Sequence, residues 1–366
     1  MTPALLIIEP NLRNPSGHYA EFVRAVGSRA TADSLEIFAH PEADAILDAM
    51  AGVNVSRKYP RVGAPFAEWR TIHRCISDSI PFLLLTADGR HAAMASFSSR
   101  FSGNNPVNAN FFFHRAPTTW RDKLLYPFSD IARLYSRAIT STEQVADSLN
   151  GLGWQRVECI PYPALAPDEL PEPIPFSHLL MAGAARLNKG LDLVAELACK
   201  WSAEKRSVPI FVQVSKKHAS KHGTRETEYV EKLLSSGYEG LRCDDEAPGR
   251  AGYIERFRGA LVLAPYIREQ FASQVSGVVL DALLNGAPVI ATKGTWPALQ
   301  IERFGAGVTI SERTPESLAA AIDSVLIDWD NFSARACAAA RVLAFEHDPN
   351  HLAGLLGVSL LTDLKK

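Results

Sequence analysis

The feature that most constrains the fold is an alternation of short apolar runs with segments of helical periodicity, which starts twice along the chain. In the first half, the apolar runs have the length of β-strands and lie at residues 4–9, 35–39, 82–86, 109–114, 138–141 and 157–160. Helix-period segments lie between them, including 19–29 and 143–152. Strands that alternate with helices favour a mainly parallel sheet that is covered on both faces.

A proline-rich segment separates the two halves. IPYPALAPDELPEPIPF, residues 160–176, carries six prolines, a density typical of a stiff, extended connector. The alternation then restarts, with strands expected at 178–182, 210–214, 261–264, 288–291 and 308–310, and helices at 191–204, 224–235, 251–257, 277–284, 315–326 and 331–346. We therefore expect an α/β protein with two Rossmann-like domains, 1–165 and 166–345, whose parallel sheets face each other across a cleft. For the tail, 346–366, we expect packing back towards the first domain.

The composition argues against several classes of protein. The 366 residues carry a net charge of −2, with 47% hydrophobic and 21% charged residues, as in ordinary globular chains. This balance gives no argument for nucleic-acid binding. The first apolar run is too short for a signal peptide or a membrane span, and the five cysteines form no Cys-x-x-Cys pair. We expect a cytoplasmic protein that holds no metal.

In open parallel sheets, ligands bind beyond the carboxyl ends of the strands, so the loops that follow the strands are the candidate sites. In the first half, Asn14-Pro15-Ser16-Gly17-His18 follows the first strand, and Gly17 allows a ligand to approach the backbone closely. The alternative is a turn glycine beside a surface histidine. A later loop begins with His114 and Arg115, which suit a polar or anionic ligand, unless Arg115 is merely solvated.

Two loops in the second half favour an anion. In MAGAARLNKGLDLV, residues 181–194, Arg186 and Lys189 lie between Gly183 and the start of a helix, a pattern that suits a phosphate clamp; a solvated basic loop is the alternative. In SGVVLDALLNGAPVIAT, residues 276–292, Ser276 is a natural N-cap, and the N–H groups of Gly277 and Val278 can point at a negatively charged ligand. Asp281, about one turn further on, can accept hydrogen bonds from hydroxyl groups. The alternative here is an ordinary capped, buried helix.

Taken in order, these segments resemble the retaining glycosyltransferases of family 4, which have the GT-B fold. MAGAARLNKGLDLV is similar to the family's donor-phosphate segment G-R-x-x-x-K-G, and SGVVLDALLNGAPVIAT to its L-E-A-x-A-x-G-x-P-V-I-A-T segment. Ser16-Gly17-His18 resembles its glycine-rich loop, and His114 a histidine that follows the fourth or fifth strand. TSTEQVADSLNGLGWQRVECIPYP, residues 140–163, resembles the last unit before the linker.

The resemblance implies roles for these residues. A nucleoside-diphosphate sugar would bind the second domain through Gly183, Arg186, Lys189, Ser276, Gly277 and Val278, with Asp281 on the ribose and Gly17 close to the donor. His114 would position the donor sugar, and His18 and Arg115 would lie on the acceptor side. The co-substrate would then be the nucleotide sugar, with no metal and no other cofactor.

The chain departs from the family pattern at one position. The family carries two glutamates, of which Asp281 replaces the second, and Ser273 stands eight residues before it where an acid is expected. Glu269 lies nearby at a different spacing. FASQVSG, residues 271–277, and Trp296 resemble a subgroup that has this serine version of the segment.

We therefore expect sugar transfer with retention to an acceptor hydroxyl, in the synthesis of a cell-envelope or extracellular polysaccharide. Two alternatives stay open: a non-catalytic GT-B subunit, which the missing glutamate favours, and a nucleotide-sugar 2-epimerase, whose set of carboxylates is not evident. Residues 57–74 and 115–128 mix basic and aromatic side chains. They favour either a solvated basic face or contact with the inner face of a membrane, where the acceptor would be a lipid-linked glycan.

Overall fold

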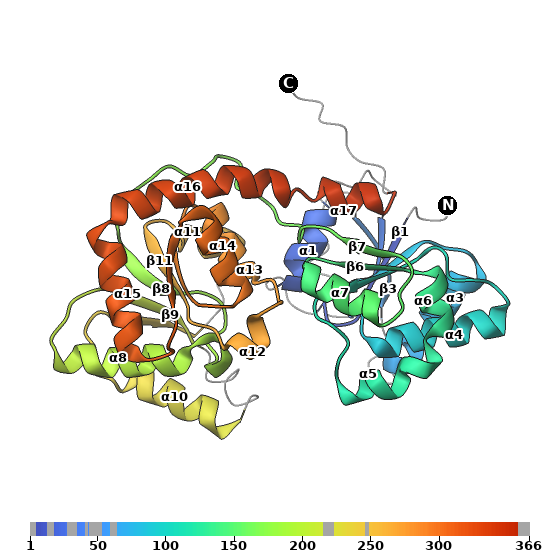
Figure 1. Cartoon of the computed structure of the whole chain (residues 1–366), viewed down its shortest axis with the longest axis horizontal. Helices are drawn as coiled ribbons and strands as arrows, with labels where there is room; N and C mark the ends of the chain where they lie inside the picture. Colours follow the sequence, from blue (N-terminus) through green and yellow to red (C-terminus); the bar gives the residue numbers. More distant parts are fainter. Residues whose placement is uncertain are drawn as a thin grey trace. The chain divides into compact units, whose positions relative to one another are not determined.

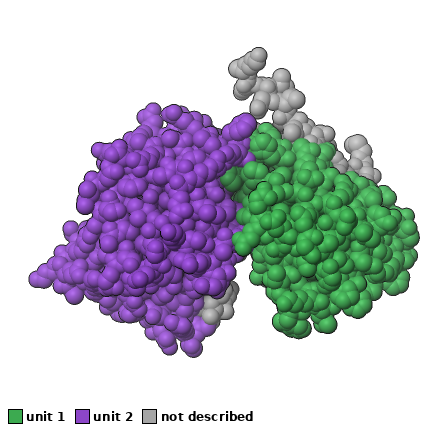
Figure 2. All heavy atoms as spheres, viewed as in Figure 1, with its two compact units in different colours: residues 1–165, 347–366 green, residues 166–346 purple. Residues whose placement is uncertain are grey.

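The computed structural model describes residues 5–12, 18–27, 35–40, 43, 53–58, 64–214, 223–245 and 249–357. The chain divides into two compact units, coloured separately in Figure 2. Unit 1 consists of Met1–Leu165 and His347–Lys366, and unit 2 of Ala166–Glu346. Among the described residues, no helix has both the length and the apolar character that a membrane crossing requires.

Unit 1 is built on a seven-stranded parallel sheet with the order β3-β2-β1-β4-β5-β6-β7. Its strands are β1 (Leu5–Glu9), β2 (Leu35–Ala39), β3 (Val53–Lys58), β4 (Phe82–Leu84), β5 (Ala109–Phe113), β6 (Arg137–Thr140) and β7 (Val157–Cys159). Strand β3 was not among the expected strands, because VNVSRK lacks the continuous apolar run that marks a buried strand. The order changes direction between β1 and β4, which is where ligands bind in sheets of this kind.

The helices of unit 1 are α1 (His18–Gly27), α3 (Ala64–Ser77), α4 (Gly89–Ser102), α5 (Trp120–Leu125), the short 3-10 helix η2 (Tyr126–Phe128), α6 (Asp130–Tyr135), α7 (Glu143–Gly151) and α17 (Asn350–Leu355). The aromatic strand β5 shows how both faces are covered. Phe111 and Phe113 pack in the core beneath α3, α4, α6 and α7. Phe112 points to the other face, where its ring lies 5.0 Å from that of Phe22 on α1.

The chain returns to unit 1 after unit 2 is complete. The His347 ring contacts the Tyr162 carbonyl at 2.7 Å through Nδ1, and the Ala164 N–H donates to the His347 carbonyl at 3.0 Å. Arg137 on β6 donates to the carbonyl of Leu355 in α17 at 2.7 Å. These bonds tie the C-terminal helix into the first sheet's unit.

Unit 2 repeats the architecture with a six-stranded parallel sheet of the order β10-β9-β8-β11-β12-β13. Its strands are β8 (His178–Met181), β9 (Ile210–Gln213), β10 (Leu241–Asp244), β11 (Ala260–Ala264), β12 (Val289–Thr292) and β13 (Gly307–Ile310). The unexpected strand is β10, an edge strand whose sequence LRCD is half polar. The sequence LVLA, in contrast, predicts the fully buried β11.

The helices of unit 2 are α8 (Leu191–Ala203), α10 (Thr224–Leu234), α11 (Arg250–Glu255), α12 (Arg268–Phe271), α13 (Gly277–Leu284), α14 (Trp296–Phe304), α15 (Pro315–Ile327) and α16 (Trp329–Glu346), with the 3-10 turn η3 (Leu187–Lys189) before α8. In Figure 1, α8, α10 and α15 cover one face of the sheet, and α13, α14 and α16 cover the other. The sheet residues and the apolar sides of α8, α10 and α15 form one core cluster.

Candidate functional site

The first candidate element is the turn that follows β8. Gly183 adopts φ +72°, and the chain then forms η3, with Arg186 as its N-cap and Lys189 as its last residue. Gly190 follows at φ +96°, and a Cβ placed there would lie 2.4 Å from Cγ of Pro265. The turn therefore requires glycine at Gly190 both for its backbone conformation and for the close approach of β11's end.

Neighbouring elements hold this turn in place. The Leu187 N–H donates to Oε1 of Glu226 on α10 at 3.0 Å, and the Ile267 N–H donates to the Asn188 carbonyl at 3.0 Å. The Asn188 amide also donates to Oε1 of Gln270 on α12 at 2.8 Å. The two cations of the turn are thus positioned by backbone and side-chain bonds from α10 and α12, as a preorganised site requires.

Lys189 is the most informative side chain of the turn. Its ammonium nitrogen lies 4.0 Å from the Cβ position of Gly183, and Cγ2 of Val278 at the start of α13 lies 3.3 Å from the same point. Burial, and then the positive charge of Arg186, lower the pKa of Lys189 to about 8. Within the described part of the chain, no carboxylate pairs with Lys189. A half-buried cation beside a second cation, with no carboxylate to neutralise it, favours a bound anion.

The start of α13 adds hydrogen-bond donors to this place. Ser276 caps the helix by accepting a bond from the Val279 N–H at 3.4 Å, and its hydroxyl donates to the Tyr266 hydroxyl at 3.4 Å. The N–H groups of Gly277 and Val278 belong to the first turn, where a helix offers no internal acceptor. A Cβ on Gly277 would meet nothing within 4 Å, so the space beside this residue is open. Asn285 and Gly286, at φ +71°, end the helix as the sequence predicts.

Asp281 lies one turn into α13 and is half-buried. One of its oxygens, Oδ2, accepts a hydrogen bond from the Tyr253 hydroxyl on α11 at 2.9 Å. Burial raises the pKa of Asp281 to about 6, although the Tyr253 bond and the charge of Arg250 act in the opposite direction. Oδ1 has no partner among the described residues, so the carboxylate retains an acceptor for a ligand hydroxyl.

In unit 1, the structure describes only part of the expected site. Gly17 lies outside the described residues, and so does the side chain of His18. His114 follows β5, and its Nε2 contacts the Leu85 carbonyl at 2.9 Å, while its ring lies 4.8 Å from that of Phe112. Because a carbonyl can only accept, Nε2 carries the proton of this bond. Arg115 is exposed. Burial and then the charge of Glu9 raise the pKa of Tyr19, and the positive charge of Arg115 acts in the opposite direction.

Sequence reasoning missed Glu9, which lies at the point where the sheet order changes direction. Glu9 is the last residue of β1 and is fully buried. Thr86 donates to its Oε2 at 2.6 Å and the Asn11 N–H to its Oε1 at 2.8 Å. Burial raises the pKa of Glu9 to about 7 despite these bonds and the charge of His91. The missed signal is the acidic residue that ends an otherwise apolar strand.

A second, partly buried network lies at the start of α4. Asp88 caps the helix, and His91 contacts the carboxylates of Asp88 at 2.7 Å and of Glu68 on α3 at 2.8 Å. Burial alone would lower the pKa of His91, but the two carboxylates outweigh it and raise the pKa to about 9. Arg90 completes the network at 3.3 Å from Glu68.

No family model matches the sequence, and no curated protein matches it either. Solved structures do match over nearly the whole chain. The Anabaena protein Alr3699/HepE in complex with UDP has 12% identity and a TM-score of 0.71, covering 98% of this chain and 98% of its own. Sucrose-phosphate synthase from Thermosynechococcus elongatus has 12% identity and a TM-score of 0.69, covering 97% of this chain and 98% of its own. A glycosyltransferase from Rickettsia africae has 12% identity and a TM-score of 0.67, with the same coverage of both chains.

These similarities show that the chain has the GT-B fold, which confirms the expected fold class. They do not distinguish family 4 from other glycosyltransferases of this fold, so that narrower assignment stays a prediction. The binding and catalytic roles expected for the individual residues also stay predictions.

Proposed function

We propose that this protein is a glycosyltransferase that takes its sugar from a nucleoside-diphosphate sugar. The observation that carries the proposal is Lys189, a half-buried cation without a carboxylate partner in the described chain, beside Gly183 and the first turn of α13. A diphosphate supplies the negative charge that Lys189 lacks among the described residues. Alr3699/HepE, which has the same fold, has been solved with UDP and with UDP-glucose.

In the proposed reaction, the chain's residues act mainly by electrostatics. Arg186, Lys189 and the N–H groups of Gly277 and Val278 hold the diphosphate and stabilise the negative charge that grows on it as the sugar leaves. Asp281 accepts hydrogen bonds from the ribose. His114 positions the donor sugar through a ring that is already oriented by the Leu85 carbonyl. The acceptor binds in unit 1, on the side of His18 and Arg115.

Several finer features of the proposal rest on the resemblance to family 4. These are retention of the anomeric configuration, transfer of the acceptor proton to the leaving phosphate, independence of metal, a cytoplasmic location, and a role in polysaccharide synthesis. The acceptor in such a role is a glycan or a lipid-linked glycan.

The experiment that tests the donor site is a thermal-shift titration of the purified protein with UDP, GDP, dTDP and ADP. A ligand that binds only the native state at about a hundredfold excess over its Kd adds about 2.7 kcal/mol of stability, which is readily measured. Lys189→Ala is expected to weaken the nucleotide that binds by about tenfold or more, because hydrogen bonds to charged groups contribute about 1.5–3 kcal/mol. The matched control is Lys200→Ala, whose ammonium is paired with Glu316 at 3.0 Å on the outside of α8.

Wild-type protein that is folded but responds to none of these nucleotides would contradict the proposal. So would a response that Lys189→Ala and Lys200→Ala reduce equally, because the effect would then not depend on Lys189.

A second function, a non-catalytic GT-B subunit, is favoured by Ser273, which occupies the position where the family pattern has an acid. This alternative predicts nucleotide binding without release of nucleoside diphosphate when nucleotide sugar and a panel of soluble and lipid-linked glycans are supplied. Release that depends on the acceptor would exclude it. Interconversion of the donor sugar without any acceptor would instead indicate an epimerase.

A further inference from the structure

Unit 1 carries an apolar stripe that faces outwards. Helix α5 has no buried residue, nor has η2, which follows it directly. Trp120, Leu124 and Phe128, spaced by four residues along this helical run, are 70%, 64% and 45% exposed. Residues at this spacing share one side of a helix, and in a globular protein the apolar side normally faces the core. Here it faces solvent.

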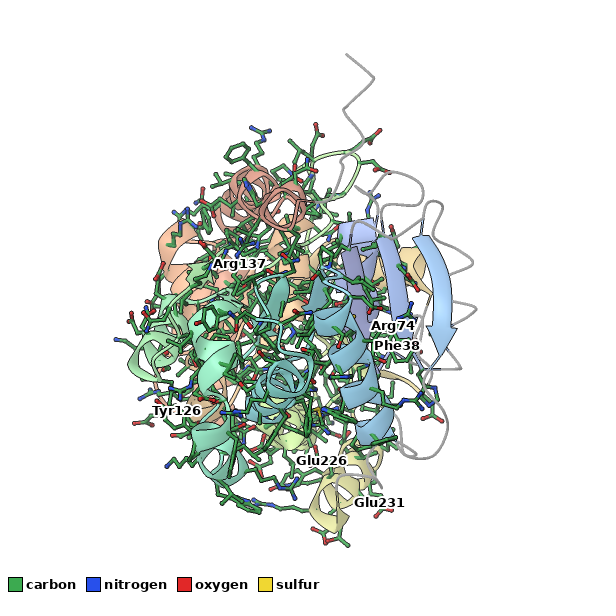
Figure 3. The ribbon with its side chains drawn as sticks, turned by 90° about the vertical axis from the view of Figure 1, so that its right-hand side faces the viewer. Phe38, Arg74, Tyr126, Arg137, Glu226 and Glu231 are labelled. Atoms are coloured by element: carbon green, nitrogen blue, oxygen red, sulfur yellow. The ribbon has the colours of Figure 1, made fainter. Side chains whose placement is uncertain are left out.

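The stripe continues onto α4, which lies beside α5 (Figure 1). The Phe128 ring stacks on that of Phe97 with a centroid distance of 5.8 Å, and Phe101, one turn further along α4, is 75% exposed. Figure 3 marks the place by the label of Tyr126 in η2. We call Phe97, Phe101, Trp120, Leu124 and Phe128 the aromatic face. A contiguous exposed apolar patch of this kind marks an interaction site.

The charges beside the aromatic face are mainly positive. Arg121 lies 5.3 Å from the Trp120 ring centroid. Arg100 lies 5.7 Å from that of Phe97 and is paired with Asp130 at 2.6 Å. Arg121 and Lys123 are exposed and have no carboxylate partner among the residues that the structure describes. The one acid of α5, Asp122, is half-buried, and its carboxylate accepts bonds from the N–H groups of Gly89 and Thr119 at 2.9 and 3.0 Å. The segment therefore presents apolar and cationic groups together.

We propose that the aromatic face docks on the surface of an anionic lipid bilayer. Aromatic side chains enter the boundary between headgroups and acyl chains, and neighbouring Arg and Lys side chains bind the lipid phosphates. A bilayer fits better than a protein partner because the exposed side chains form a row with unpaired cations beside it. Helix α3 carries a similar pair, with Phe66 62% exposed and Arg70 6.0 Å from its ring, and it packs against α4.

The test is cosedimentation of the full-length protein with vesicles of phosphatidylcholine and with vesicles of phosphatidylcholine and phosphatidylglycerol, at low ionic strength. Binding is expected only to the second kind and should weaken as salt is added. The double variant Trp120→Ser, Leu124→Ser is expected to lower the partition coefficient about tenfold or more, and so is Arg121→Glu, Lys123→Glu. All four side chains are exposed, so the variants should fold, which circular dichroism checks.

Matched controls come from unit 2. Ile327→Ser removes an apolar side chain that is 88% exposed on α15, and Arg242→Glu reverses an exposed charge on β10; both should bind like the wild type. Absence of binding to anionic vesicles overturns the proposal, and so does binding that both face variants retain. Light scattering provides a further check. If it shows a dimer that the double variant Trp120→Ser, Leu124→Ser dissociates, and if vesicles are not bound, the aromatic face is a protein interface and the lipid proposal is wrong.

The inference does not depend on sugar transfer. Lys189→Ala, which should weaken nucleotide binding, is expected to leave vesicle binding unchanged, so the two proposals fail or succeed separately.

Discussion

Replacing Glu9 by glutamine is expected to stabilise the protein, but only above about pH 4.5, where Glu9 of the unfolded wild-type chain ionises. Glu9 is fully buried, with Thr86 and Asn11 donating to its two oxygens. Burial raises the pKa of Glu9 from its ordinary value of 4.5 to about 7, while those bonds and the charge of His91 reduce the rise. Glutamine has the shape of the protonated carboxyl and carries no charge at any pH.

The sign and size of the effect follow from the two pKa values. Between pH 4.5 and about pH 7, the folded state keeps a proton that the unfolded chain has released, so the free energy of unfolding falls as pH rises. Each pKa unit is worth about 1.36 kcal/mol, so the wild type loses about 3 kcal/mol across this window. Glu9→Gln does not undergo this loss. Its advantage over the wild type should therefore be near zero at about pH 4.5 and about 3 kcal/mol at about pH 8.

The measurement is urea unfolding at about pH 5 and about pH 8, followed by tryptophan fluorescence, to which Trp154 in the core of unit 1 contributes. The matched control is Glu158→Gln, which changes an exposed glutamate on β7 and should shift stability equally at both pH values. A Glu9→Gln variant whose stability difference from the wild type is independent of pH would refute the reasoning. A variant less stable than the wild type at pH 8 would do so as well.

His91 gives a pH dependence of the same sign in a higher window: its stabilising effect is present below pH 6.5 and is lost as pH rises through about 9. Urea unfolding at about pH 6 should show a loss of about 3 kcal/mol in His91→Gln, and an unchanged midpoint there would contradict the network. Gly190→Ala places a Cβ 2.4 Å from Pro265 at φ +96° and should cost about 2 kcal/mol or more in thermal stability. Gly277→Ala meets nothing within 4 Å and should change stability by less than about 1 kcal/mol while weakening nucleotide binding; wild-type affinity in that variant would argue against a diphosphate at α13.

The elements with clear end signals are the ones that the sequence predicts best. Helix α13 is found at Gly277–Leu284 as expected, because Ser276 caps its start and Asn285-Gly286 ends it. Strand β2 is likewise found at Leu35–Ala39. Strands β3 and β10 were missed because half-polar strands at sheet edges have neither an apolar run nor strict alternation.

The candidate site could be predicted only as separate segments. The spacing of Arg186 and Lys189 indicates a basic turn, but not that Lys189 lies beside Val278, since that proximity arises from the order of strands in the sheet. Glu9 was missed for a similar reason, because its environment is set by a residue that is distant in the sequence. Its burial and its raised pKa depend on Thr86, which is 77 residues away, and no local pattern reports such a partner.

The return of the chain to unit 1 has a consequence for biosynthesis. A ribosome makes residues 166–346 as one uninterrupted stretch, so unit 2 has every element it needs before α17 exists. Unit 1 begins first but is completed last, because the bonds from His347 to Tyr162 and Ala164, and from Arg137 to α17, form only after unit 2 has been made. The nascent chain therefore carries a first unit that has all seven strands but lacks α17 throughout the synthesis of unit 2, and stopping translation after Glu346 would leave unit 2 whole and unit 1 without α17.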